Sequence, residues 1–276
     1  MHARNRWSRG LAFALLLCLG LIACGEPLVP HSPQAVYNLA KEQLTNGQYR
    51  AAADSLRRVT ETDPTGEIGR RALVLRTALL GGMARGFQSV AEDYLAGSKQ
   101  AQAAQLRIVA MDYFSRARGR SFEMVDELER VLKQPTTSPF RVDYWPAAPP
   151  GGDALQKVRQ GQPLSEAELP AAERATVQRS LAEVLSALAG QTGTPGNDTD
   201  IEPAVLYLGA ARELVRLTDI FRPEALDERR MTQLYLERAA TLARQAAELA
   251  QARGDQKTQA GAEQLLQECE GAFKKR

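Results

Sequence analysis

Long stretches of the chain are built from Ala, Leu, Glu, Gln and Arg, the residues that form helices most readily. Aromatic residues make up only 6% of the chain, whereas an all-β sandwich or barrel would need more of them, together with more Val, Ile and Thr. Apolar residues reach 44%, which provides enough core for a folded body and argues against wholesale disorder. We therefore predict an all-α protein.

The first 23 residues have the pattern of a secretory signal peptide. Arg4, Arg6 and Arg9 precede an apolar run from Leu11 to Ile22, which is shorter than the roughly 20 residues that a membrane-spanning helix needs. A basic start, a short apolar core and a small residue before the cleavage site are typical of such signals. We predict that residues 1–23 are removed and are not part of the fold.

The residues around the cleavage site, Leu21-Ile22-Ala23-Cys24, resemble a bacterial lipobox, in which an aliphatic and a small residue precede an invariant Cys. The resemblance implies that Cys24 is diacylated on its sulfur and becomes the first residue of the mature protein. Two acyl chains would anchor the protein stably to a membrane. The next residue is Gly25 rather than Asp, which implies sorting to the outer membrane, facing the periplasm, in a Gram-negative host. The alternative is an ordinary signal peptide with an incidental Cys.

Charges and cysteines limit the partners and bonds of the mature chain. The whole chain has 35 basic and 33 acidic residues, so no strong field of one sign indicates nucleic acid, and we predict no nucleic-acid partner. With Cys18 removed and Cys24 lipidated, Cys269 is the only thiol left and no intrachain disulfide can form. A reactive thiol or a pair between chains is one interpretation. Because Leu265 and Leu266 are close by, we favour a small buried hydrophobe.

We predict four regions after the signal peptide. A short Pro-containing segment would form an extended tether that lifts the body off the membrane. Two helical domains would follow, separated by a Pro- and Gly-rich linker or functional loop without helical periodicity. The predicted bounds are 24–32 for the tether, 33–134 for the first helical domain, 135–165 for the linker or loop and 166–276 for the second helical domain.

Residues 35–64 resemble a tetratricopeptide repeat, a helical hairpin in which small and large residues alternate at the contact between the helices. Ala40 and Ala52 would let the helices approach closely, Asn46-Gly47 would form the turn, and Asp63-Pro64 would end the second helix. The resemblance implies helical hairpins stacked as a TPR-like α-solenoid. Gln43 departs from the repeat, which usually has a large apolar residue there. The matching residues are Val36, Leu39, Ala40, Gly47, Tyr49, Ala52, Leu56, Val59 and Pro64.

The order of lipobox, tether and a hairpin with Asn-Gly-Gln-Tyr at its turn is similar to that in BamD-type lipoproteins of the outer-membrane β-barrel assembly machine. The likeness covers residues 32–80, and regular repeats do not continue beyond them. Further along, we predict a turn at Gly81-Gly82, a long helix over 100–132 with Gly119 as a candidate break, and a helix with Pro170 at its first position. Helices over 203–221 and 224–253 would precede a turn at Gly254-Asp255 and a last helix through Cys269.

The sequence contains little that indicates catalysis. The only histidine after processing is His31, which lies in the tether, and no zinc or phosphate-loop motif is present. Asp198, Asp200 and Glu202 have the spacing that begins a calcium loop, but the residues that an EF-hand requires further along are missing. We interpret this segment as a polar loop with a helix-capping acid. We predict no metal, no cofactor and no enzymatic activity.

Two charged groups of residues lie on the same predicted helix. Arg107, Arg116, Arg118 and Arg120, with Tyr113 and Phe114 between them, form a basic patch that could contact anionic lipid headgroups or an acidic partner. Arginines that extend over a helical core are the alternative. The carboxylates of residues 123–129 are interpreted as a solvated face. These are Glu123, Asp126, Glu127 and Glu129.

We predict a lipid-anchored cell-envelope protein that acts as a scaffold or adaptor and binds an unidentified envelope protein through its TPR-like helices. The predicted partner-binding residues are Asn38, Gln43 and Tyr49 in the first hairpin. Tyr144 and Trp145 in the loop either bind a partner or anchor the loop to the body. The alternative functions are a ligand-binding or transporter-accessory lipoprotein with a pocket between helices, and a structural spacer.

Overall fold

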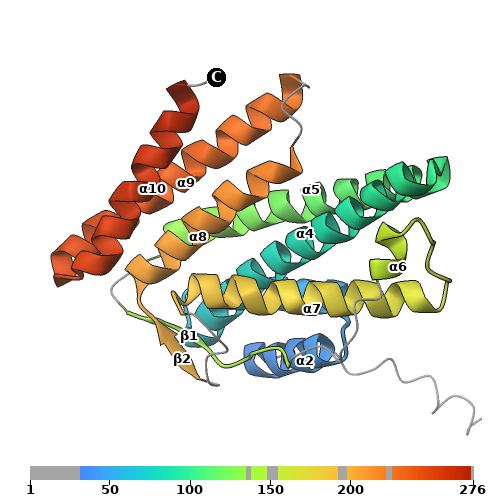
Figure 1. Ribbon diagram of the computed structural model, residues 1–276. Helices are drawn as coiled ribbons and strands as arrows, with labels where there is room; N and C mark the ends of the chain where they lie inside the picture. Colours follow the sequence, from blue (N-terminus) through green and yellow to red (C-terminus); the bar gives the residue numbers. More distant parts are fainter. Residues whose placement is uncertain (1–31, 135–137, 148–154, 192–197, 222–225, 275–276) are drawn as a thin grey trace, which may run out of the picture.

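A computed structural model of the chain describes residues 32–134, 138–147, 155–191, 198–221 and 226–274 (Figure 1). The predicted signal peptide, Cys24 and the tether up to His31 lie outside these residues. Within the described part the protein is all-α, as predicted, with one short β-ribbon. No helix in that part is both long enough and apolar enough to span a membrane.

Helices are labelled as in Figure 1, beginning with α2. Their bounds are α2 Pro33–Thr45, α3 Tyr49–Thr62, α4 Glu67–Ala101, α5 Ala104–Leu132, α6 Leu155–Arg159, α7 Glu168–Leu188, α8 Pro203–Leu217, α9 Leu226–Arg253 and α10 Gln256–Lys274. The ribbon pairs β1 (Phe140–Val142) with β2 (Thr199–Ile201) in antiparallel fashion. A 3-10 turn, η1 (Thr218–Ile220), follows α8.

Helices α2 and α3 form the predicted hairpin. Ser32 caps α2 by accepting a hydrogen bond from the Ala35 amide at 3.2 Å. The turn includes Gly47 at a φ of +70°, a conformation that glycine adopts at little cost. Ala40 and Ala52 are fully buried, consistent with close approach of the two helices. The hairpin is confirmed. Its extension into a stack of TPR-like repeats stays a prediction, and the next two helices, α4 and α5, are much longer than α2 and α3.

The turn predicted at Gly81-Gly82 is wrong, because α4 continues through both residues for 35 residues in total. These glycines serve helix packing instead. A Cβ on Gly82 would lie 2.6 Å from the Leu181 Cα of α7, and one on Gly86 would lie 2.9 Å from the Val177 Cα. Tertiary packing of α7 on this glycine face therefore outweighs the local preference of glycine for turns.

Helix α5 also continues without interruption, through Gly119, and so the candidate break there is wrong. The long helix itself is confirmed, beginning at Ala104 after a left-handed Gln102. Figure 1 shows α4 and α5 running side by side through the centre of the molecule, and many close contacts join them.

The segment predicted as a linker or loop contains both β1 and α6 in its described part. Phe140 and Val142 are fully buried, and the Arg70 guanidinium lies over the Phe140 ring at 4.7 Å. The Asp143 carboxylate accepts hydrogen bonds from the Tyr37 hydroxyl at 2.5 Å and from Lys41 at 2.9 Å. Residues 138–147 are thus a strap that packs against the N-terminal hairpin.

The C-terminal part follows the sequence prediction closely. Helix α8 begins at Pro203, α9 ends at Arg253 and the turn to α10 has Gly254 at a φ of +73°. Cys269 is buried, 1% exposed, as predicted, and burial raises the pKa of its thiol. Pro223 lies outside the described residues. Helix α7 begins two residues before Pro170, which is therefore not at the first helical position.

The solvated face predicted for the carboxylates of residues 123–129 is wrong for Glu127, whereas Asp126 is exposed and Glu123 and Glu129 are partly exposed. Glu127 is only 2% exposed and pairs with Arg76 of α4, which is itself buried. Arg76 also donates from Nε to the Ala53 carbonyl at 3.1 Å. Burial lowers the pKa of Arg76 to about 10, which still leaves it charged at neutral pH, so that the buried carboxylate has a cationic partner.

Candidate functional site

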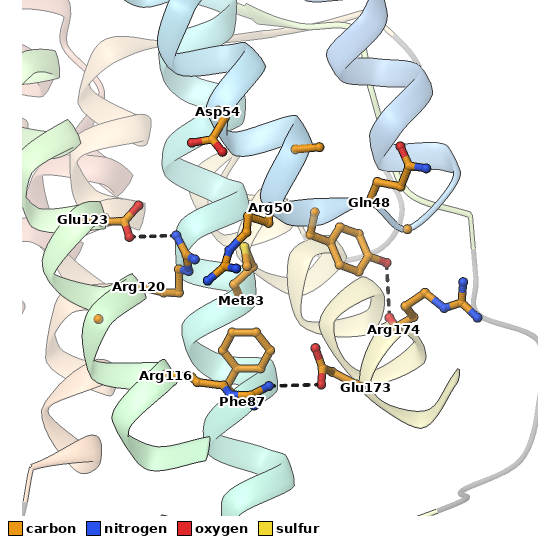
Figure 2. A pocket seen from close by; sticks show the side chains of 14 residues that line it. Gln48, Arg50, Asp54, Met83, Phe87, Arg116, Arg120, Glu123, Glu173 and Arg174 are labelled. Atoms are coloured by element: carbon orange, nitrogen blue, oxygen red, sulfur yellow. Dashed lines mark hydrogen bonds and ion pairs between the residues drawn. The ribbon is translucent and has the colours of Figure 1, made fainter. Parts of the chain in front are cut away.

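A groove of about 850 Å³ lies where the first turn of α3 meets α4, α5 and α7 (Figure 2). Its lining brings together segments that are far apart in the sequence. Apolar side chains from α4 are surrounded by charged side chains from the other three helices. The charged lining residues are Arg50 and Asp54 from α3, Arg116, Arg120 and Glu123 from α5, and Glu173 and Arg174 from α7.

The upper edge of the groove is the turn between α2 and α3. A Cβ on Gly47 would lie 2.7 Å from the Cδ of Arg174, so the absence of a side chain lets α7 approach this turn. The Tyr49 hydroxyl donates to the Arg174 carbonyl at 3.2 Å. This contact fixes the first turn of α3 against α7.

The floor consists of Met83 and Phe87, which stand one turn apart on α4 and are both buried. Behind them, the ring of Tyr113 on α5 lies 6.1 Å from the rings of both Phe87 and Tyr94. Aromatic pairs at this separation contribute beyond the area they bury. The floor is therefore a packed part of the core.

A network at the lower edge joins α5 to α7. The Tyr113 hydroxyl donates to the Glu173 carboxylate at 2.8 Å, and Arg116 lies 3.7 Å from the same carboxylate. Arg116 also stands 4.9 Å from the centre of the Tyr113 ring. Burial and the nearby Glu173 charge raise the pKa of Tyr113 well above its ordinary value, so its hydroxyl remains a proton donor.

The other carboxylates of the groove also have cationic partners. Glu123 pairs with Arg120 at 2.7 Å and lies 3.8 Å from Arg76, while Asp54 lies 3.5 Å from Arg57. Arg50 differs from these arginines. Among the described residues, no carboxylate lies within 4.0 Å of its guanidinium.

Of the partner-binding residues predicted in the first hairpin, only Tyr49 lines the groove. Asn38 is exposed on α2 and accepts a hydrogen bond from Gln34 at 3.1 Å. Gln43 accepts one from Ser55 of α3 at 2.8 Å. The polar residue at the position where the repeat usually has a large apolar one therefore joins the two helices of the hairpin.

Tyr144 and Trp145 lie in the strap, half-buried against the core. Burial raises the pKa of Tyr144, and Tyr144 lies close enough to Tyr49 to contribute to the raised pKa of Tyr49, which burial chiefly raises to about 12. The structure thus brings Tyr144 near the hairpin turn. Neither Tyr144 nor Trp145 lines the groove.

The predicted basic patch is largely neutralised by neighbouring acids. Arg116 pairs with Asp112 at 2.7 Å, and Arg118 pairs with Glu228 of α9. Two of the patch arginines, Arg116 and Arg120, line the groove. Sequence reasoning missed Arg50, Arg174, Met83 and Phe87, because no local pattern shows which faces of α3, α4 and α7 meet.

The segment with calcium-loop spacing has a structural role. Asp198 pairs with Arg141 of β1 at 2.8 Å and Asp200 lies in β2. Glu202 is at the N-cap of α8 without a side-chain capping bond. Within the described ranges, no three His, Cys, Asp or Glu side chains are grouped so that they could hold a metal ion.

No protein-family model and no curated protein matches the sequence, and no solved structure matches the fold.

Proposed function

We propose that this chain is a lipid-anchored cell-envelope protein that binds a segment of a partner protein in the groove between α3, α4, α5 and α7. The observation that carries the proposal is the groove itself, with its apolar floor and charged rim. Protein interfaces commonly combine an apolar centre with a polar edge. A scaffold or adaptor needs such a surface, and no catalytic arrangement is part of the proposal.

The location rests on the N-terminal sequence. A basic start, a short apolar run and the residues before Cys24 support export and lipidation. In a Gram-negative host, Gly25 after the lipidated cysteine supports the outer membrane, with the body in the periplasm. The tether that follows would then let the groove face a partner at the membrane surface.

The TPR-like resemblance supports the same function. The hairpin α2–α3 supplies the upper edge of the groove, and tetratricopeptide proteins generally hold partner segments in surfaces between stacked hairpins. The sharper form of the proposal, a role similar to that of BamD-type lipoproteins, depends on the residues up to Leu80. It would make components of the β-barrel assembly machine the expected partners.

Photo-crosslinking in intact cells tests the proposal. A photoreactive amino acid at Gln48, which is exposed at the edge of the groove, should give a discrete adduct with another protein. The same amino acid at Arg58, exposed further along α3 and outside the groove, is the matched control. Equal adducts from both positions, or none from Gln48, would contradict binding in the groove.

The size of the groove supports a second candidate, a ligand-binding or transporter-accessory lipoprotein. A volume of about 850 Å³ falls within the range of small-molecule sites, roughly 300–1,000 Å³. Native mass spectrometry of the protein released from its own membranes would show a bound small molecule as a fixed mass increase. If Ala51→Trp, which would fill the groove, removed that increase, the second candidate would replace the first.

A further inference from the structure

Among the groove arginines, Arg50 and Arg174 have no carboxylate of the described residues within 4.0 Å, and Figure 2 shows the side chain of Arg174 extending away from Arg50. Arg50 is the second residue of α3 and is exposed. In Figure 2 its side chain and that of Arg120 extend toward the same part of the groove, beside Met83. Arg120 is already paired with Glu123 at 2.7 Å, so Arg50 is the guanidinium in this part of the groove that has no carboxylate partner among the described residues.

None of the three carboxylates that line the groove has its oxygens within 4.0 Å of the Arg50 guanidinium, and Asp54, on the same helix, pairs with Arg57. Glu173 already accepts the Tyr113 hydroxyl and lies near Arg116, while Glu123 faces Arg120 and Arg76. Since no carboxylate of the described residues stands within 4.0 Å of Arg50, its donors are available to a group from outside.

The backbone adds to the positive potential at the same place. The first residues of α3, Tyr49, Arg50 and Ala51, all line the groove. Gln48 at the N-cap gives no side-chain hydrogen bond to the amides of this turn, which carry the partial positive charge of a helix N-terminus. The apolar floor formed by Met83 and Phe87 has a low dielectric constant, which strengthens the electric field of these amides in the groove.

We propose that the groove binds a partner segment in which an acidic side chain stands next to an apolar one. The acid would bind Arg50 and the apolar side chain would lie over Met83 and Phe87. This inference rests on the proposed function and specifies the chemistry of the partner. The positive charge of Arg50 favours an acidic side chain in the partner. The apolar floor between the charged edges favours an apolar side chain next to that acid.

The test uses the full lipidated chain in phosphatidylcholine nanodiscs and two fluorescent peptides. In one peptide Glu alternates with Leu, and in the other Gln replaces every Glu. We expect the Glu peptide to bind more tightly, with an affinity that falls as salt is added. Arg50→Gln should weaken its binding roughly tenfold, because a charge-assisted contact is lost. Arg58→Gln, the same charge change on the same helix outside the groove, should leave binding unchanged.

Any one of four results would overturn the inference. The peptides could bind equally well, or Arg50→Gln and Arg58→Gln could have equal effects. Isothermal titration could also show that inorganic phosphate occupies the site while the Glu peptide fails to bind. The occupant would then be a phosphate group.

Arg50→Lys tests whether charge alone suffices, and it should retain more affinity than Arg50→Gln. If it loses as much as Arg50→Gln and salt has no effect, charge does not select the ligand.

The crosslink from Gln48 separates this inference from the proposed function. If the adduct forms in cells carrying Arg50→Gln as strongly as in the wild type, groove binding stands and the acidic preference fails. If no adduct forms in the wild type, the proposed function fails first.

Discussion

At the level of single residues, the contact between α4 and α7 depends on the absence of side chains. A Cβ on Gly82 would meet the backbone of Leu181, and one on Gly86 would meet that of Val177. Backbone atoms cannot rotate away as the end of a long side chain can. Glycine weakens a helix by about 1 kcal/mol relative to Ala, and here the close approach of α7 offsets that cost.

We expect Gly82→Ala to lower the free energy of unfolding by about 1–3 kcal/mol, because the added methyl group overpacks the seam between α4 and α7. Urea unfolding monitored by circular dichroism measures the change. Gly119→Ala is the matched control, because a Cβ there meets nothing within 4 Å, and it should stabilise α5 by about 0.5–1 kcal/mol. Equal effects at both positions would show that the seam does not require glycine.

The buried pair of Arg76 and Glu127 is a second feature of single residues. Both side chains are almost fully enclosed, and the next carboxylate, Glu123, lies 3.8 Å from Arg76. We expect Glu127→Gln to lower the free energy of unfolding by about 3–5 kcal/mol, because it leaves the buried Arg76 charge with only the more distant and more exposed Glu123 as an anionic partner. The double variant Arg76→Met and Glu127→Leu should be more stable than Glu127→Gln alone. Chemical denaturation of both proteins would contradict this if the double variant were the less stable.

At the level of elements, the start of α7 is fixed by reciprocal bonds between Ser165 and Glu168. The Ser165 hydroxyl accepts from the Glu168 amide at 3.3 Å, and the Glu168 carboxylate accepts from the Ser165 amide at 3.0 Å. Lys157 of α6 also donates to Glu168 at 2.8 Å. These contacts lower the pKa of Glu168 from 4.5 to about 2, the bond to Lys157 contributing most.

A lowered pKa in the folded state makes Glu168 stabilising above its ordinary pKa. The contribution decreases as the pH falls from 4.5 toward about 2. We therefore expect the first turn of α7 to open in that window, seen as faster amide exchange by hydrogen–deuterium mass spectrometry. Glu168→Gln should remove most of this pH dependence, while Glu166→Gln, an exposed neighbour, should keep it. An unchanged profile in Glu168→Gln would refute the assignment.

Sequence reasoning found the elements whose signals are local. The hairpin was predictable because Asn46-Gly47 and Asp63-Pro64 mark its turn and its end, and α8 because Pro203 starts it. The glycines of α4 were misread, because glycine in a turn and glycine under a crossing helix look the same in a sequence. The burial of Glu127 and the groove were not predictable for a related reason. Both depend on which helix faces meet, and helical periodicity leaves that undetermined.

At the level of the whole molecule, one apolar core extends from Val36 to Cys269 and includes residues of both predicted helical domains. The division into two domains stays a prediction. Helix α4 contacts α3, α5, α6 and α7, so it connects the N-terminal hairpin to the later helices. The groove lies against this central helix, which places it on the most extensively supported part of the fold.

The attachment of the whole molecule to a membrane depends on Cys24 in our proposal. We expect Cys24→Ser to abolish incorporation of labelled palmitate and to shift the protein out of the washed membrane fraction, because both acyl chains would be lost. Cys269→Ser, which changes the buried thiol, should leave labelling and fractionation unchanged. Full retention of Cys24→Ser in membranes would show that something other than this cysteine holds the protein there.

The glycine face of α4 also has a consequence for the order of events during synthesis. The chain emerges from its N-terminus, so α2 to α5 are complete before α7 exists, and the seat of α7 stays empty in the meantime. At Gly82 and Gly86 that surface is helix backbone whose hydrogen bonds are already made. Helix α7 can therefore approach α4 closely at these two positions without any side chain having to move aside.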